Sequence, residues 1–126
     1  MRAIEQKIIE AINKAIVNKK DSTLSMRDTV IYNGKNKIIY KLWDNSVFSV
    51  SLDKKEICFT CHGWFSVTTK SRLNALLRVF GSGHIYQKDY QFYYKSDKQD
   101  IMISGTKCYN IENGTLKEIA QQEFYY

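Results

Sequence analysis

The chain has 126 residues, enough for one domain with one modest hydrophobic core, so we expect a single domain over residues 1–126. Its 19 Lys and Arg against 13 Asp and Glu give a formal net charge of +6, which argues against an acidic DNA mimic and favours acidic partners, either nucleic acid or an acidic protein surface. No apolar run approaches the roughly 18 residues of a membrane span, and we expect no membrane partner.

The first predicted element is an amphipathic helix over residues 3–19. Apolar side chains recur there at helical spacing, and charged residues occupy other positions. The members of the apolar stripe are Ile4, Ile8, Ala11, Ile12 and Ala15. Because charges interrupt the apolar positions, the segment lacks the continuous apolar core of a secretion signal. We therefore expect a cytoplasmic protein whose three cysteines, Cys58, Cys61 and Cys108, are thiols.

Residues 23–126 change to the period of two that is typical of strands. The stretch NGKN at 33–36 separates two β-rich runs, which predicts a hairpin. A second hairpin signal, Asn113-Gly114, lies within 107–119. The tail QQEFYY at 121–126 is aromatic, and we expect it either to pack on the domain or to fray.

The stretch CFTCH at 58–62 has the Cys-x-x-Cys-His pattern that attaches c-type haem. In a strand, however, Cys61 falls on the apolar face and Cys58 on the opposite face. Two cysteines on opposite faces cannot hold one haem or one metal ion, and a zinc site would have only one further histidine, His84. We therefore expect no cofactor and no metal, with Cys61 as a small core residue.

A second helix is predicted over about 68–80, inserted between strands. Thr68 or Thr69 is the expected N-cap. Lys70 and Arg72 stand near the start of this helix, where cations oppose the positive end of the helix dipole. An anion would relieve that conflict, so the two side chains and the free helix amides form a candidate phosphate or carboxylate cradle. The alternative is that both side chains extend into water.

Residues 66–99 carry six cations against two acids, interleaved with aromatic side chains. Cations bind phosphates and aromatic rings stack on bases, so this mixture suits single-stranded nucleic acid. Tyr and Arg are also favoured anchors of protein interfaces. Alternation within the run 83–96 places Tyr90, Phe92 and Tyr94 in the core. The candidate binding residues are Lys70, Arg72, Arg78, Lys88, Tyr86 and Tyr93.

No catalytic arrangement is evident in the sequence. The acidic residues are scattered, no glycine-rich phosphate loop occurs, and no base stands at a recognisable spacing from a cysteine or serine nucleophile. We therefore expect no enzymatic activity. An N-terminal helix followed by a mainly antiparallel sheet with one inserted helix predicts an α+β domain.

Three segments resemble a small uncharacterised domain that recurs in tailed-phage proteins. They are GW at 63–64, TTKSRLNALL at 68–77 and IYQKDYQFYY at 85–94. The matching positions are Gly63, Trp64, Thr68, Thr69, Arg72, Leu73, Asn74, Ile85, Gln87 and Lys88. The likeness covers roughly residues 25–105 and leaves the N-terminal helix and the C-terminal hairpin outside. It implies a phage origin and supplies no catalytic residues.

Two functions fit these expectations. The first is a phage accessory protein that binds a host protein or nucleoprotein complex in the host cytoplasm. It would inhibit or redirect a host nucleic-acid machine, such as a CRISPR effector or a restriction complex, without catalysis. The second is a DNA- or RNA-binding module whose phosphate contacts come from Lys70, Arg72, Arg78 and Lys88. Size, charge and the phage resemblance favour the first.

Overall fold

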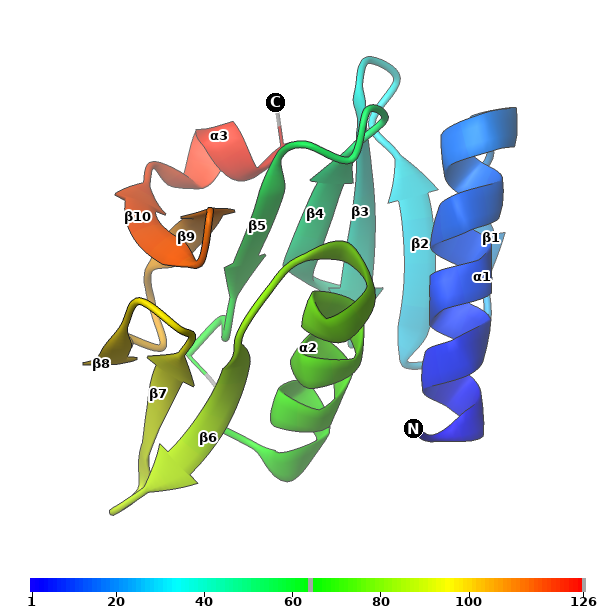
Figure 1. The fold of residues 1–126 in the computed structure, drawn as a ribbon. Coiled ribbons are helices and arrows are strands. Elements are labelled where there is room, and N and C mark those ends of the chain that lie inside the picture. The colour runs from blue at the N-terminus through cyan, green and yellow to red at the C-terminus, as the bar shows by residue number, and fades with distance from the viewer. Residues whose placement is uncertain (64, 126) are drawn as a thin grey trace.

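The computed structural model describes residues 1–63 and 65–125, and it confirms the predicted α+β class (Figure 1). The N-terminal helix occupies the predicted segment, and the second helix is inserted between strands as expected. The elements are α1 (Ala3–Asn18), β1 (Ser22–Thr23), β2 (Asp28–Tyr32), β3 (Lys37–Leu42), β4 (Asn45–Ser51), β5 (Ile57–Thr60), α2 (Val67–Phe80), β6 (His84–Lys88), β7 (Gln91–Lys95), β8 (Asp100–Met102), β9 (Cys108–Glu112), β10 (Thr115–Ile119) and α3 (Gln121–Tyr125).

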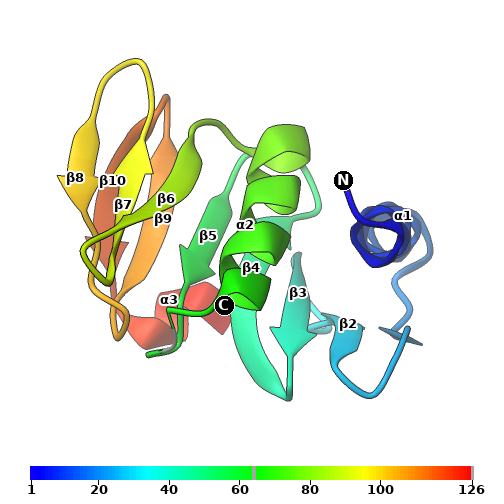
Figure 2. The same cartoon turned by 90° about the horizontal axis from the view of Figure 1, so that it is seen from below.

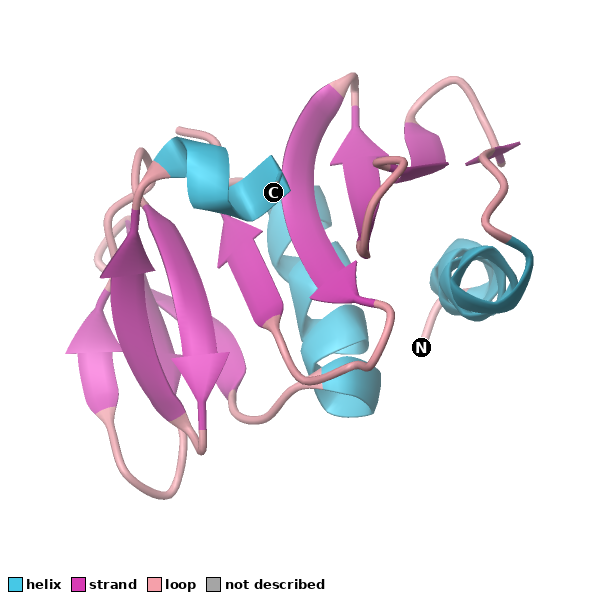
Figure 3. Cartoon of the chain, turned by 90° about the horizontal axis from the view of Figure 1, so that it is seen from above, coloured by secondary structure: helices cyan, strands magenta, loops and turns pink. Residues whose placement is uncertain are grey.

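The strands form two antiparallel sheets. Sheet A has seven strands in the order β1-β2-β3-β4-β5-β9-β10, and sheet B has three in the order β6-β7-β8. Both α1 and α2 lie on one face of sheet A, whereas α3 lies on the other (Figures 2 and 3). Sheet B stands beside α2, on the side away from α1 (Figures 1 and 2).

The main core fills the space between sheet A, the two long helices and the inner face of sheet B. Its central side chains are completely buried, and each such side chain stabilises the fold by about 1.5–3 kcal/mol relative to an exposed position. The most buried members include Ile12, Phe48, Phe59, Leu73 and Phe92.

A second, smaller core lies on the opposite face of sheet A, where Phe124 of α3 packs on Ile39, Cys58 and Cys108. Phe124 is fully buried, so the described part of the tail packs on the domain through this side chain, whereas Tyr126 lies outside the described residues. Cys61 belongs to the main core. The two cysteines of the CFTCH stretch therefore lie on opposite faces, as their alternation predicted.

The hairpins signalled by NGKN at 33–36 and by Asn113-Gly114 are both present. The structure adds a tight turn that the sequence did not reveal, Asp89-Tyr90 between β6 and β7. Both residues have positive φ, 52° and 65°, a region that favours glycine or asparagine. The prediction that Tyr90 is a core residue is wrong, because the turn leaves its side chain 89% exposed.

The start of α2 also differs from the prediction. Its N-cap is Ser66, whose hydroxyl accepts a hydrogen bond from the backbone N–H of Thr69 at 3.1 Å. Neither Thr68 nor Thr69 is the N-cap, because the helix begins at Val67, one residue before the predicted start. Thr69 lies within the first turn of the helix, and its side chain is buried. Arg72 consequently stands beyond the first turn.

Candidate functional site

The predicted anion cradle at the start of α2 is not formed, because Arg72 points into the protein and is only 1% exposed. Its guanidinium donates to the carboxylate of Glu5 on α1 at 3.0 Å and to that of Asp28 on β2 at 3.2 Å. These two carboxylates are the anions that satisfy the cation. The prediction that Arg72 contacts a phosphate or a partner is therefore wrong.

The environment of Arg72 is a buried polar network. Ser71 donates to Glu5, and the hydroxyl of Tyr40 donates to Asp28. Burial alone would raise the pKa of Glu5 and of Asp28, but the hydrogen bonds and the guanidinium outweigh burial and lower both below their usual values. Burial and Asp28 raise the pKa of Tyr40 well above its usual range. Both carboxylates are thus ionised at neutral pH and serve the structure.

Two of the predicted binding residues, Tyr86 and Tyr93, meet on the outer face of sheet B. They are directly paired across β6 and β7, with ring centroids 5.2 Å apart and ring planes inclined by 14°. Both rings are partly exposed, while the alternate residues Ile85 and Phe92 face the core. The sheet therefore presents a stacked aromatic pair to solvent.

Basic side chains flank this pair on the same face. Lys88 and Lys95 are exposed and stand on either side of the tyrosines along the strands. A carboxylate also lies close by, since the Tyr86 hydroxyl donates to Asp100 on β8. That hydrogen bond raises the pKa of Tyr86 to about 12, so the phenol stays neutral. We call this surface the tyrosine face and define it by His84, Tyr86, Lys88, Gln91, Tyr93 and Lys95.

The remaining predicted residues lie elsewhere. Lys70 and Arg78 are on α2 and line a separate cleft of about 370 Å³, together with Arg2 from the start of the chain. Of the six predicted binding residues, Tyr86, Tyr93 and Lys88 therefore share one surface, and Lys70 and Arg78 share another. The sixth, Arg72, is buried.

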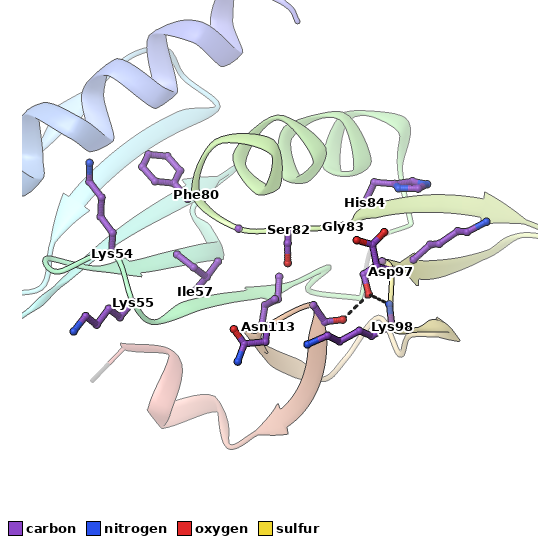
Figure 4. Close-up of a pocket in the computed structure, with 15 residues that line it drawn as sticks. Lys54, Lys55, Ile57, Phe80, Ser82, Gly83, His84, Asp97, Lys98 and Asn113 are labelled. Carbon is purple, nitrogen blue, oxygen red and sulfur yellow. Dashed lines mark hydrogen bonds between the residues drawn. The ribbon is translucent and has the colours of Figure 1, made fainter.

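A basic groove of about 580 Å³ adjoins the tyrosine face (Figure 4). It lies where the β4–β5 turn, the end of α2, the β7–β8 turn and the β9–β10 turn meet. Four lysines and one acid, Asp97, line it, and it shares His84 and Lys95 with the tyrosine face. The other three lysines are Lys54, Lys55 and Lys98.

Apolar side chains of Ile57, Phe80 and Ile111 also line the groove. In Figure 4, Lys98 extends toward Asn113, whereas Lys54 and Lys55 lie at the other end and reach outward. Sequence reasoning missed both of these lysines, because they precede the 66–99 segment and approach it only through the folding of the two sheets.

Side-chain hydrogen bonds fix sheet B in place. The amide of Asn74 on α2 donates to the carbonyl of Ile85 at 2.8 Å and accepts from its N–H at 2.7 Å. On the other side, Gln99 accepts from the N–H of Leu116 on β10, and Ser96 donates to the carbonyl of Gly114. These hydrogen bonds therefore connect sheet B, which carries the tyrosine face, to α2 and to the β9–β10 turn, which both border the groove.

Within the described residues, no cluster of three or more His, Cys, Asp or Glu side chains forms that could hold a metal ion. The three thiols are buried, and burial raises the pKa of each, in the case of Cys61 to about 12. No helix in the described part of the chain is both long and apolar enough to cross a membrane.

Comparison with known proteins gives one family. The family model described as Kyanoviridae Gp96 protein matches residues 1–117. No curated protein and no solved structure matches the chain. The match confirms the expected phage-protein domain, and it reaches beyond the predicted 25–105 to include α1 and β9. The chain therefore belongs to the Kyanoviridae Gp96 protein family.

Proposed function

We propose that this phage protein binds single-stranded nucleic acid on the tyrosine face. The observation that supports the proposal most is the stacked pair of Tyr86 and Tyr93 on the open side of a sheet. Stacking of a base on an aromatic side chain stabilises a complex by about 1–3 kcal/mol, and it tolerates any base sequence.

The charges around the pair favour the same ligand. Lys88 and Lys95 stand where phosphates would pass on either side of the stacked rings. The carboxylate of Asp100 is engaged by the Tyr86 hydroxyl and orients that ring. An unpaired strand fits better than a duplex, because bases reach an aromatic face only when they are free of their own helix.

Fluorescence anisotropy with labelled 12-mers of DNA and RNA, single- and double-stranded, tests this proposal at about 50 and 200 mM salt, where counterion release weakens phosphate contacts. Tyr93→Ala should weaken single-strand binding about 5- to 150-fold, the range given by one lost stacking interaction. Trp43→Ala is the matched control, because Trp43 is a half-exposed aromatic side chain on sheet A, in the β3–β4 turn. Equal binding by wild type and Tyr93→Ala, or no binding at 50 mM salt, would refute the proposal.

An accessory role in the host cytoplasm is the second proposal, in which the protein occupies and inhibits a host nucleic-acid machine such as a CRISPR effector. The observation that favours it is an exposed apolar pair: Trp43 is 50% exposed and Met26 is 93% exposed. Their backbones are neighbours, since the N–H of Trp43 donates to the carbonyl of Arg27, the residue that follows Met26. Large exposed apolar side chains of this kind anchor protein interfaces.

A cleavage assay with a purified CRISPR effector, its guide and a target DNA tests this second role. Inhibition that Trp43→Ala abolishes and Tyr93→Ala leaves intact would support it. No inhibition at a tenfold excess of protein would remove that effector from consideration and leave nucleic-acid binding as the better account. Neither proposal includes a catalytic step.

A further inference from the structure

We propose that the basic groove is the second half of the nucleic-acid site, so that a strand stacked on the tyrosine face continues past Lys95 into the groove. This inference rests on the proposed function. Its geometric basis is that His84 and Lys95 belong to both surfaces. A strand that leaves the stacked rings along β7 therefore reaches the groove without crossing another part of the molecule.

The distribution of charge selects this direction. Asp100 on β8 lies opposite Lys95, beside the path to the groove, and its carboxylate accepts a hydrogen bond from the Tyr86 hydroxyl. At the far tip of the hairpin stands Asp89. The groove instead carries four lysines against a single aspartate. A nucleic-acid strand that is bound at one end to Tyr93 therefore has the most favourable electrostatic energy when it continues toward the lysines of the groove.

The lining of the groove suits a nucleotide as well as a phosphate. Its volume of about 580 Å³ lies within the roughly 300–1,000 Å³ that is typical of small-molecule sites. Ile57, Phe80 and Ile111 supply apolar contact for a sugar or a base edge, and Asn113 supplies an amide for hydrogen bonding.

The groove is also built in advance of binding. The backbone at Gly83 has φ +75°, and a Cβ there would stand 2.6 Å from the hydroxyl of Tyr94, so glycine keeps this wall in place. Ser96 ties the β7–β8 turn to the β9–β10 turn through Gly114. A site that is already ordered loses less conformational entropy when a ligand binds.

The test compares the affinity of the wild type and of the triple variant Lys54→Ala/Lys55→Ala/Lys98→Ala for single strands of 4 to 16 nucleotides. Each lost phosphate contact reduces the salt slope by about 0.7 for a single strand. The triple variant should therefore bind the 12-mer at least about 10-fold more weakly at 50 mM salt, with a slope smaller by up to about 2. Its affinity should also stop rising at a shorter strand length than that of the wild type.

The matched control is Lys7→Ala/Lys14→Ala/Lys20→Ala. It removes the same charge from exposed positions in or just after α1, on the side of the molecule away from sheet B (Figure 1). The inference is overturned if the two triple variants lose the same affinity, or if the groove variant binds the 12-mer within twofold of the wild type. A groove variant that binds normally while Tyr93→Ala does not would refute only this inference. Normal binding by Tyr93→Ala would refute the proposed function itself.

Discussion

Arg72 of α2 donates from its Nη1 to the Oε2 of Glu5 on α1 at 3.0 Å, in the interior of the protein. The same guanidinium reaches Asp28 on β2 through its Nε. One buried cation thus joins two helices and a strand. Lys37 is also buried, whereas the other cations of the described residues are exposed or partly exposed and set the charge that a ligand meets.

Removing this cation should be costly. Arg72→Ala leaves Glu5 and Asp28 buried without their partner, and breaking a buried ion pair in this way typically lowers the free energy of unfolding by about 3–5 kcal/mol. Urea denaturation followed by circular dichroism measures the change. Arg78→Ala, at an exposed position on the same helix, should change stability by no more than about 0.5 kcal/mol. A loss below 1 kcal/mol for Arg72→Ala would contradict the role given to the network.

Stability should fall in acid because of the same carboxylates. The pKa values of Glu5 and Asp28 are lower in the folded protein than in the unfolded chain. Their contribution is therefore complete above their ordinary values of about 4 and is lost as the pH falls through the lower, folded values. Urea midpoints between pH 6 and pH 2.5 test this. Glu5→Gln should flatten the acid dependence, whereas Glu10→Gln, exposed on α1, should not. A midpoint independent of pH would contradict the prediction.

Tyr90 should be a strained residue in the β6–β7 turn. Its φ of 65° destabilises a residue with a side chain by about 1–2 kcal/mol, and glycine at this position would remove that cost. Glycine also makes the unfolded chain more flexible, which lowers the stability of the folded protein by about 0.5–1 kcal/mol. Tyr90→Gly should therefore raise the free energy of unfolding by about 0.5–1 kcal/mol. Thermal and urea unfolding measure it.

Gly114→Ala in the β9–β10 turn is the opposite control. It places a side chain at a residue whose φ is +76°, and it should therefore destabilise the protein. If Tyr90→Gly instead destabilised the fold, the exposed ring would have to make contacts that its 89% exposure does not indicate.

The three thiols should react slowly in the folded protein. Cys58, Cys61 and Cys108 are buried, and burial raises the pKa of each, so little reactive thiolate forms at neutral pH. Ellman's reagent should titrate fewer than one thiol in the first minute under native conditions and all three in urea. Rapid reaction of one thiol in the folded protein would contradict this prediction, because it would show that the structure around that cysteine opens to solvent.

Much of the fold follows from local patterns that the sequence displays. The N-terminal helix and the hairpin at Asn113-Gly114 were predictable because their signals lie within a few residues of one another. Arg72 was misassigned, since its partners are 67 and 44 residues away along the chain. Local spacing showed a cation near a helix start, but only the packing of α1 and β2 supplies the carboxylates.

In the candidate site, too, local patterns predicted some residues, and others depend on contacts between distant parts of the chain. Alternation around β7 put Tyr93 outside the core, with Tyr86 as a second exposed candidate, and the structure adds that the two partly exposed rings stack on each other. Tyr90 interrupted the pattern because its turn lacks the glycine that usually marks such a position. Lys54 and Lys55 were not recognisable, since their turn meets the β7–β8 turn only after the two sheets have come together.

The paired hydrogen bonds between Asn74 and Ile85 have a consequence for the behaviour of the protein at high concentration. An outer strand with free N–H and C=O groups is a template on which another chain can add a strand. The amide of Asn74 occupies both groups of Ile85, so a side chain takes the position of the next strand and ends sheet B. A second chain therefore finds no free backbone pair at Ile85 on which to extend sheet B, and the aromatic surface stays available to ligands.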